Sequence, residues 1–389
     1  MVQGASAMKS GVVVVPGYNR ALSLSRLLNS IEVSDMEADT PLIISLDGGY
    51  TVDVVNEVES FIQKTRFKNL KLVKHKRNLG LRNHILKCGD YALKYDFAVI
   101  LEDDLYVTPD FYSYACQACA FYSDTDGIAG IALYAPVHNE VSGLPFTPIK
   151  DCTASYFMQI PCSWGQLWSA KQWKRFRNWY EKNQTLSLSE INELPNSVAN
   201  WPESSWKKYF YAYCVTENKF FVYPYRTRTT NFADPGGVHM ANGSDKMQTE
   251  FPTLTTHADI VFQNMSKNSI MYDGFMEVFP STIGLPSDHC INLEGQKPPI
   301  LTHRYEKVVS TQSPSHWDAS YGLKMRPAAQ NIYHQIPGSE IFIHDSSLVV
   351  DAGPSSNYIL HLTGFDPIRL NLLLPFLKIF LRKFIRKVC

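Results

Sequence analysis

The first hundred residues alternate between apolar runs and segments with helical spacing, and this alternation restricts the fold more than any other feature. Apolar runs predict four strands, at 11–16, 42–46, 70–73 and 97–101. Apolar residues spaced along one helical face predict three helices, at 21–31, 52–62 and 81–93. Continuous apolar strands separated by helices are typical of parallel sheets that are covered on both faces. We therefore expect an α/β fold with a mostly parallel, Rossmann-like sheet and helices on both sides.

Three adjacent carboxylates, Glu102, Asp103 and Asp104, follow the fourth predicted strand. Open α/β sheets bind ligands beyond the carboxyl ends of their strands. Adjacent carboxylates repel one another, and a hard divalent cation is a natural counter-charge. A solvated acidic turn is the alternative, but the apolar strand ahead of the triplet disfavours it. We interpret the next segment, 105–111, as a turn that leads into a helix.

Charge balance and missing motifs exclude several classes of function. The chain has 37 basic and 37 acidic residues, so its formal net charge of zero gives no reason to expect a nucleic-acid partner. No Gly-x-Gly-x-x-Gly motif follows the first strand, which disfavours a dinucleotide-binding fold. No Gly-x-x-x-x-Gly-Lys motif occurs, which disfavours a P-loop nucleotidase. Eight scattered cysteines fit a reducing compartment, and we interpret Cys116 and Cys119 as packing residues on a helix.

The rest of the chain is less regular. Segment 136–244 is rich in aromatic residues, with helices predicted at 170–180 and 206–215. Segment 245–366 is polar and rich in Ser, Thr, Pro and Asn, and we expect an irregular α+β region there with short β segments such as 341–343.

The last segment, 367–389, has no acidic residue, and its apolar and basic residues fall on opposite helical faces. This pattern predicts a basic amphipathic helix that lies on an anionic membrane surface. A terminal helix that docks on its own domain is the alternative, but it leaves the row of cations unexplained. We therefore expect a cytoplasmic protein that is peripheral on the inner face of the cell membrane.

Four short motifs occur in order at the predicted strand ends: VPGYNR at 15–20, SLDGG at 45–49, NLGL at 78–81 and LEDDL at 101–105. Together they resemble the nucleotide-sugar-binding half of a GT-A glycosyltransferase. Segment 102–111 resembles N-acetylglucosaminyltransferase I and its relatives. Segments 163–168, 223–224 and 236–239, with Asn231, are similar to bacterial family-two-type glycosyltransferases. The resemblance covers roughly residues 11–240. It implies a nucleotide-sugar-binding half at 11–135 and an acceptor-binding, catalytic half at 136–244, followed by the appended region at 245–366 and the tail at 367–389.

The resemblance implies a UDP-sugar donor and a bound Mn²⁺ or Mg²⁺ that neutralises the departing diphosphate. By resemblance, Asp104 is the direct metal ligand, Asp103 contacts the ribose or the waters of the ion, and Glu102 contacts the donor sugar. His239 is the candidate for a second metal ligand, because imidazole can bind Mn²⁺. A structural histidine is the alternative.

The resemblance also assigns residues to the nucleotide. Asp47 is expected to bind the edge of the uracil, and Arg20 is expected beside the base or the phosphates. Pro16 and Tyr18 are expected to shape the base pocket. For Asp47, a turn-forming role is the alternative, because two glycines follow it.

An inverting transfer needs a general base for the acceptor hydroxyl. The relatives carry an acidic residue ahead of a tryptophan-bearing helix, and Glu203 is the nearest carboxylate to that position here. This chain has Ser204 and Ser205 where N-acetylglucosaminyltransferase I has paired aspartates. A charge at a helix N-terminus is the alternative role of Glu203. Glu217 and Asp234 are weaker candidates for the base.

These expectations define a metal-dependent, inverting glycosyltransferase of bacterial type. It would move a sugar from a UDP-sugar to a lipid-linked or surface-polysaccharide acceptor at the membrane. Two alternatives remain: a nucleotidyltransferase on a similar sheet, and a non-catalytic, membrane-docked scaffold that binds nucleotide-sugar. The nucleotidyltransferase is disfavoured because segment 17–20 lacks the glycine-rich loop and the lysine that such an enzyme is expected to carry.

Overall fold

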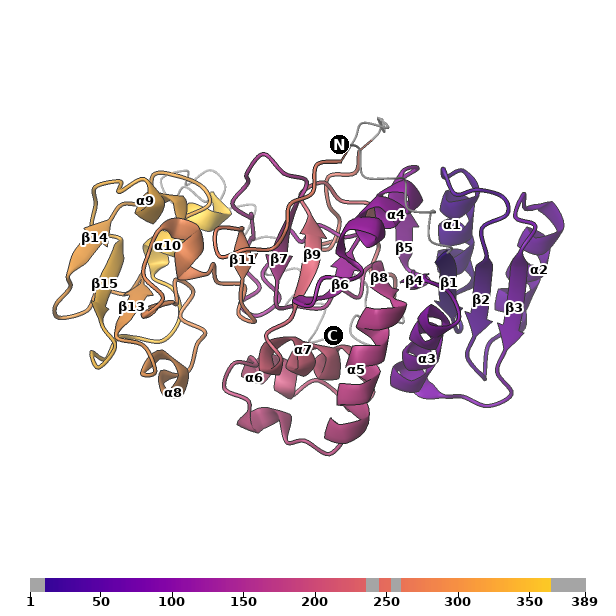
Figure 1. The fold of residues 1–389 in the computed structure, drawn as a ribbon, viewed down its shortest axis with the longest axis horizontal. Helices are drawn as coiled ribbons and strands as arrows, with labels where there is room; N and C mark the ends of the chain where they lie inside the picture. Colours follow the sequence, from indigo (N-terminus) through magenta and orange to yellow (C-terminus); the bar gives the residue numbers. More distant parts are fainter. Residues whose placement is uncertain (1–10, 236–244, 253–259, 365–389) are drawn as a thin grey trace, which may run out of the picture.

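A computed structural model of the 389-residue chain describes residues 11–235, 245–252 and 260–364. A nine-stranded sheet runs through most of the molecule (Figure 1). Its strands lie in the order β11 (Met271–Tyr272), β7 (Ser155–Met158), β9 (Phe220–Pro224), β6 (Ile128–Ala132), β8 (Gln166–Ser169), β4 (Phe97–Ile100), β1 (Gly11–Gly17), β2 (Leu42–Leu46) and β3 (Leu70–Lys74). The predicted α/β class is confirmed.

The four strands at one end of this sheet are those predicted from the first hundred residues. β4, β1, β2 and β3 pair in parallel, with Val13 opposite Leu42 and Gly11 opposite Phe97. The other strands are mixed: β8 runs antiparallel to both β4 and β6, while β6 and β9 are parallel. The sheet therefore continues without a break across residue 135, and the proposed division of the chain there stays a prediction.

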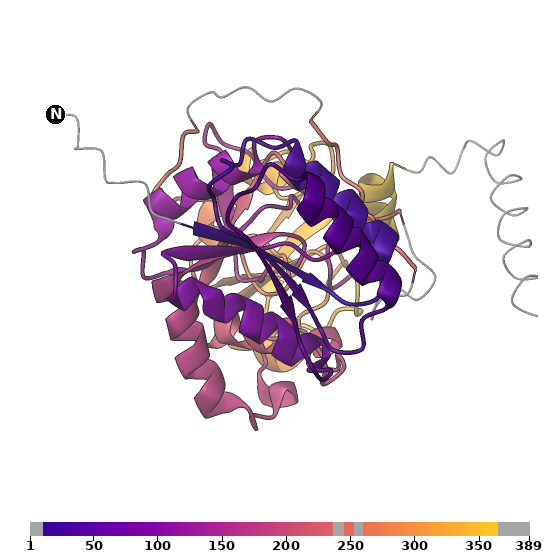
Figure 2. The same cartoon turned by 90° about the vertical axis from the view of Figure 1, so that its right-hand side faces the viewer.

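Helices cover both faces of the sheet (Figures 1 and 2). One face carries α1 (Ala21–Glu32), α2 (Val52–Lys64) and α4 (Phe111–Tyr122), and the other carries α3 (Gly80–Gly89), α5 (Ala170–Asn183) and α7 (Lys207–Thr216). The valines of β1 show how one strand serves both layers. Val13 and Val15 pack with the α1 side, while Val12 and Val14 pack with the α3 side, and all four are fully buried.

The segment after the carboxylate triplet differs from the prediction. It forms a short strand, β5 (Leu105–Val107), before the expected helix α4 begins. β5 pairs antiparallel with β10 (Thr229–Asn231), with Leu105 opposite Asn231. The partner lies more than a hundred residues away, so local spacing gave no sign of this strand. Cys116 and Cys119 lie on α4 as interpreted from the sequence.

The appended region contains a second sheet, seen at the left of Figure 1. Its strands lie in the order β12 (His289–Ile291), β13 (Lys307–Ser310), β15 (Ile341–Asp345) and β14 (Ala319–Tyr321). The helices of this region are α8 (Pro299–Thr302), α9 (Gln330–Tyr333) and α10 (Ser356–Thr363). The short helix α6 (Asn196–Ala199) lies earlier in the chain, between α5 and α7. Across the described ranges, every helix is too short or too polar to cross a membrane. The predicted tail at 367–389 lies outside the described residues.

Two buried carboxyl groups, Glu277 and Glu294, lie where the appended region meets the main sheet. The backbone amide of Glu294 donates to Oε1 of Glu277 at 2.7 Å, and Nδ2 of Asn139 donates to Oε2 of Glu294 at 2.8 Å. Burial, followed by the neighbouring Glu294 charge, raises the pKa of Glu277 to about 8, although Lys297 opposes the shift. Folding therefore favours the protonated form of Glu277 at neutral pH.

Replacing Glu277 with Gln should make the stability of the protein less sensitive to pH. Between about pH 5 and pH 8 the unfolded chain ionises Glu277 while the folded chain retains its proton, so the free energy of unfolding falls as pH rises. Glu277→Gln lacks this titration. Its free energy of unfolding should rise relative to wild type by up to about 1.4 kcal/mol for each pH unit.

Urea unfolding at several pH values between 5 and 8 measures this difference. Glu181→Gln is the matched control, because the side chain of Glu181 is 62% exposed. Curves for Glu277→Gln and wild type that run parallel over this range would contradict the prediction.

Candidate active site

A cavity of about 570 Å³ opens at the carboxyl ends of β1, β2 and β4. Its volume lies within the usual range for small-ligand sites. Strand ends and turns of the first hundred residues line it. Later segments, which carry Glu140, Trp164, Trp201 and Lys207, line it as well. Seven residues predicted from the sequence line this one cavity: Pro16, Tyr18, Arg20, Asp47, Glu102, Asp103 and Asp104.

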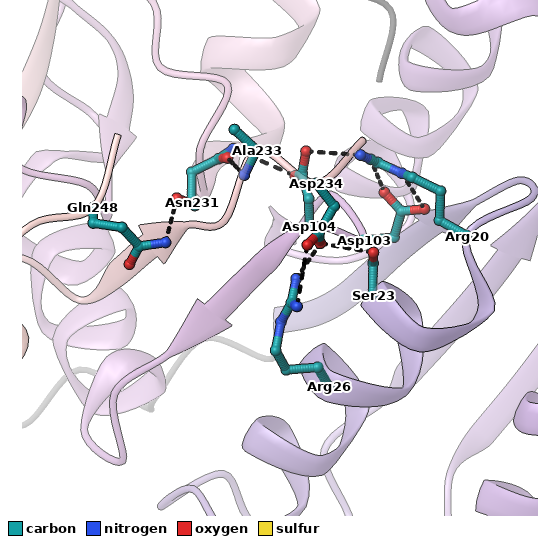
Figure 3. Close-up of polar contacts among 9 residues, drawn as sticks. All are labelled: Arg20, Ser23, Arg26, Asp103, Asp104, Asn231, Ala233, Asp234 and Gln248. Atoms are coloured by element: carbon teal, nitrogen blue, oxygen red, sulfur yellow. Dashed lines mark hydrogen bonds and ion pairs between the residues drawn. The ribbon is translucent and has the colours of Figure 1, made fainter. Parts of the chain in front are cut away.

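Arg20 joins two carboxylates of the triplet (Figure 3). It immediately precedes α1, and its side chain reaches across to the end of β4. Nη1 lies 3.1 Å from Oδ2 of Asp104, Nε lies 3.4 Å from Oδ2 of Asp103, and Nη2 pairs with Oδ1 of Asp103. Burial raises the pKa of Asp103 to about 6, and the Arg20 charge opposes that shift. One guanidinium thus offsets much of the repulsion within the triplet.

Asp104 is also held from the side of β10. Nδ2 of Asn231 lies 3.4 Å from Oδ1 of Asp104, and the amide of Phe232 donates to the carbonyl oxygen of Asp104 at 2.9 Å. Asn231 is fixed in turn, because Nε2 of Gln248 donates to its carbonyl oxygen at 3.0 Å. Figure 3 shows Asn231 and Gln248 on the side of Asp104 away from α1. The β5–β10 pair therefore sets the direction in which this carboxylate points.

Glu102 is the least compensated member of the triplet. Its Oε1 is buried and finds no hydrogen-bond partner among the described residues. Burial, followed by the charges of Asp104 and Asp103, raises the pKa of Glu102 to about 8. Arg20 and Lys207 oppose the shift. The end of β4 thus combines a buried negative cluster with an unsatisfied acceptor, which is the environment that a cation or a hydroxyl-bearing ligand would relieve.

Asp47 links two turns at the edge of the cavity. Its Oδ1 accepts from the amides of Gly48 at 2.9 Å and Leu79 at 2.8 Å, and its Oδ2 accepts from the amide of Gly80 at 3.1 Å. The carboxylate therefore joins the end of β2 to the start of α3. This turn-forming role exists whether or not Asp47 also contacts a nucleobase.

The carboxylates at the end of β4 meet the requirements of a divalent cation. No three His, Cys, Asp or Glu side chains converge into a complete metal cluster within 11–235, 245–252 and 260–364. Mg²⁺, however, is commonly held by one or two carboxylates together with the phosphates of a substrate. Asp103 and Asp104 offer hard oxygen ligands at the mouth of the cavity, and the unpartnered oxygen of Glu102 lies in the same triplet. These residues fit Mn²⁺ or Mg²⁺ that shares its coordination with a diphosphate.

Residues 12–128 match a protein-family model described as "Glycosyl transferase family 2". These residues are a glycosyl transferase family 2 domain. The domain contains β1 to β5, α1 to α4 and the whole carboxylate triplet, and it ends where β6 begins. The prediction of a GT-A glycosyltransferase domain is confirmed. The cavity-lining residues Glu140, Trp164, Trp201 and Lys207 lie outside the matched residues.

Several solved structures share part of this fold. They include "Mannosyltransferase PcManGT from Pyrobaculum calidifontis in complex with GDP-Man and Mn2+", at 15% identity over 46% of this chain and 47% of that chain, with a TM-score of 0.32. They also include S. aureus TarS 1-349 in complex with UDP-GlcNAc, at 17% identity over 60% and 61% of the two chains, with a TM-score of 0.38. GalNAc-T7 with UDP, GalNAc and Mn²⁺ matches at 12% identity over 58% and 44%, with a TM-score of 0.40. The chain thus covers less than two thirds of each structure. No curated protein matches it.

Glu203 is not among the residues that line the cavity. Ser204 and Ser205 line the cavity, whereas Glu203 does not, and its side chain is 76% exposed. Its Oε1 accepts from Nζ of Lys208, and its Oε2 accepts from the hydroxyl of Tyr209 at 2.8 Å. These two hydrogen bonds lower the pKa of Glu203. The general-base role of Glu203 stays a prediction, and this orientation does not support it.

The other candidates have different surroundings. Asp234 lines the cavity, but it accepts from the hydroxyl of Ser23 at 2.7 Å and pairs with Arg26 of α1 (Figure 3). Glu217 caps the end of α7 and does not line the cavity. His239 lies outside the described residues, so its predicted metal role stays a prediction.

Two charged residues of the cavity were missed by the sequence reasoning. Nζ of Lys207, at the start of α7, lies 2.8 Å from Oε1 and 2.6 Å from Oε2 of Glu140. Both side chains are largely buried, with 10% and 15% of their surfaces exposed. Glu140 stands in an irregular segment without a motif, and the two residues are 67 positions apart. Only the tertiary structure brings them together.

Replacing Arg20 with Met should destabilise the metal-free protein and make divalent cations more stabilising. Removal of one partner from a largely buried ion pair costs about 3 kcal/mol, because the remaining charges lose their compensation. Mn²⁺ would then supply the positive charge that Arg20 provides in the wild type. Thermal unfolding with and without millimolar Mn²⁺ should show a larger upward shift for Arg20→Met than for wild type.

Arg177→Met is the matched control, since Nε of Arg177 lies 3.2 Å from Oδ1 of Asp90 outside the cavity lining. It should lose stability without gaining a larger response to Mn²⁺. Equal Mn²⁺ shifts in Arg20→Met and wild type would show that the cation does not bind at this triplet.

Proposed function

We propose that the protein is a metal-dependent, inverting glycosyltransferase that moves a sugar from a UDP-sugar to a lipid-linked or surface-polysaccharide acceptor. One observation carries the proposal. The carboxylate triplet of a family 2 domain and tryptophans from outside that domain line one cavity of about 570 Å³. A nucleotide-sugar and an acceptor can therefore meet between two chemically different walls.

The lining residues from the first hundred or so positions, which we call the donor wall, would position the UDP-sugar and supply charge. Tyr18 and Asp47 line the end of the cavity that the turns after β1 and β2 form, where the resemblance expects the base. Arg20, Asp103 and Asp104 lie beside it, where a diphosphate would reach the carboxyl end of β4. Mn²⁺ or Mg²⁺ held by Asp104 would neutralise the charge that develops on the departing diphosphate. Glu102 offers its unpartnered oxygen to a hydroxyl of the sugar.

The acceptor wall supplies apolar surface. Trp164, Trp201 and Trp206 line it, and the flat rings of tryptophan can pack against sugar faces. Inversion follows if the acceptor hydroxyl attacks the anomeric carbon from this wall while the diphosphate leaves toward the triplet. The triplet and the tryptophans line the same cavity, and this supports a single displacement between a donor and an acceptor that are bound there together.

The membrane assignment rests on the sequence pattern of residues 367–389 alone, which lie outside the described residues. Opposed apolar and basic faces favour binding to an anionic surface. A lipid-linked acceptor would then be presented close to the cavity. Cytoplasmic location on the inner membrane face is part of the same proposal.

Replacing Asp104 with Asn should remove the contribution of Mn²⁺ to UDP binding. Asparagine keeps the shape of the side chain but lacks the charge that a hard cation prefers. Calorimetric titration with UDP should show tighter binding by wild type in millimolar Mn²⁺ than in a chelator, and this gain should fall at least about tenfold in Asp104→Asn, or about 1.4 kcal/mol.

Asp126→Asn is the control, because Asp126 is 83% exposed, pairs with Arg175 and does not line the cavity. It should bind UDP as wild type does. A wild-type protein that binds no UDP at millimolar Mn²⁺ would rule out the proposed function.

Removal of residues 367–389 should release the protein from anionic membranes. The segment carries six Lys or Arg residues and no Asp or Glu, so it loses attraction to anionic headgroups when it is deleted. Sedimentation with phosphatidylglycerol vesicles should pull down the full chain, and the truncated chain should remain in the supernatant. Phosphatidylcholine vesicles are the control. Co-sedimentation of the truncated chain would contradict the membrane assignment.

A further inference from the structure

We infer that Glu140, rather than Glu203, takes the proton from the acceptor hydroxyl during transfer. This inference rests on the proposed function and goes beyond it by naming a catalytic residue outside the family 2 domain. The cavity has six acidic lining residues among those described: Asp47, Glu102, Asp103, Asp104, Glu140 and Asp234. A general base must be one that faces the acceptor and is not committed to the donor.

Three of these residues, Asp47, Asp103 and Asp104, are already bonded to groups of the first hundred residues. Both oxygens of Asp47 accept backbone amides and join the turns after β2 and β3. Asp103 and Asp104 share the guanidinium of Arg20. These contacts tie all three to the turns and strand ends where we propose that the nucleotide binds, so we do not assign the base to them.

Two more lining carboxylates, Glu102 and Asp234, lie next to the triplet and to α1 respectively. Glu102 directly precedes the two Arg20-bound carboxylates, at the end of β4. Asp234 is tied to α1 by the hydroxyl of Ser23 and by the guanidinium of Arg26, as Figure 3 shows. In the proposed function Glu102 contacts the donor sugar, and the ion pair of Asp234 with Arg26 holds it against α1, so we do not assign the base to either residue.

Glu140 is the acidic lining residue that belongs to the acceptor wall. Its carboxylate is held by Nζ of Lys207, at 2.8 and 2.6 Å from its two oxygens. The same Nζ lies 5.5 Å from the ring centre of Trp164 and 5.6 Å from that of Trp201. Glu140 is therefore paired with a cation between two aromatic rings, which is the surface where a sugar acceptor would pack.

The loop that carries Glu140 is rigidly anchored. Asn139 is 1% exposed, and its Nδ2 donates to Oε2 of Glu294 at 2.8 Å and to the carbonyl oxygen of Phe275 at 3.2 Å. Its Oδ1 accepts from the amide of Val141 at 2.8 Å. The amide of Glu140 itself points at Sδ of Met276, at 3.2 Å. Asn139 and the backbone amide of Glu140 thus contact the appended region, and these contacts hold the start of this loop in place.

The proposed step forms one bond, breaks one bond and moves one proton. The acceptor oxygen forms a bond to the anomeric carbon, and the bond from that carbon to the diphosphate oxygen breaks, with its electron pair leaving on UDP. The hydroxyl proton moves to a carboxylate oxygen of Glu140. Each carboxylate oxygen can accept more than one hydrogen bond, so Lys207 and the acceptor can bind at the same time. Lys207 holds the carboxylate of Glu140 in position before the transfer.

The test measures UDP release from UDP-GlcNAc, UDP-glucose and UDP-galactose in Mn²⁺, with water in place of the acceptor. The proteins compared are wild type, Glu140→Gln, Glu140→Asp and Glu203→Gln. Glu140→Gln keeps the shape of the side chain but cannot accept a proton, so its kcat should fall about 100-fold or more. Its affinity for UDP should stay within about twofold of wild type. Glu140→Asp should be faster than Glu140→Gln, because it retains a carboxylate. Glu203→Gln should lose much less activity than Glu140→Gln.

Glu193→Gln is the neutral control, since Glu193 pairs with Arg304 on the surface and does not line the cavity. Wild-type turnover in Glu140→Gln would overturn the inference while leaving the proposed function standing. A Glu140→Gln variant as fast as Glu140→Asp, or a larger loss in Glu203→Gln, would also overturn it. The proposed function has its separate test in the Mn²⁺-dependent binding of UDP by wild type, so the two failures are distinguishable.

Discussion

The pairing of Arg20 with Asp103 and Asp104 is the interaction on which the cavity depends. Three adjacent carboxylates at the end of a buried strand would otherwise repel one another in a poorly solvated place. The guanidinium reaches from the start of α1 to the end of β4 and so fixes the turn after β1 against the triplet. The β5–β10 pair holds Asp104 from the other side through Asn231. The acidic centre is thereby fixed between two separate elements of the fold.

The first half of the fold follows from local patterns, because each of its strands and helices carries its own periodicity. The strand at 97–100, for example, ends within one residue of its predicted end. The gathering of Asp47 and the triplet at one cavity could also be predicted, because the carboxyl ends of neighbouring parallel strands meet at one edge of the sheet. β5 was missed because its hydrogen bonds go to β10, more than a hundred residues later. Glu140 was missed for the same reason, since nothing in its own segment predicts contact with Lys207.

Glu203 shows a different limit of sequence reasoning. It lies shortly before Trp206 and α7, but the direction of a side chain depends on its neighbours in space. Lys208 and Tyr209 of α7 hold the carboxylate in solvent, while Ser204 and Ser205 face the cavity. A motif can fix where a segment lies without fixing which of its residues enters the site.

The anchoring of Asn139 on Glu294 has a consequence for how the protein is made. The four parallel strands of the first hundred residues pair mainly with one another, so much of this part can fold while the chain is still being synthesised, although Asp104 gains its contact with Asn231 only later. The loop after Asn139 has its partner 155 residues downstream. The loop that carries Glu140 can therefore be anchored only after residue 294 has left the ribosome, so this part of the cavity is completed later than the strands that carry the triplet.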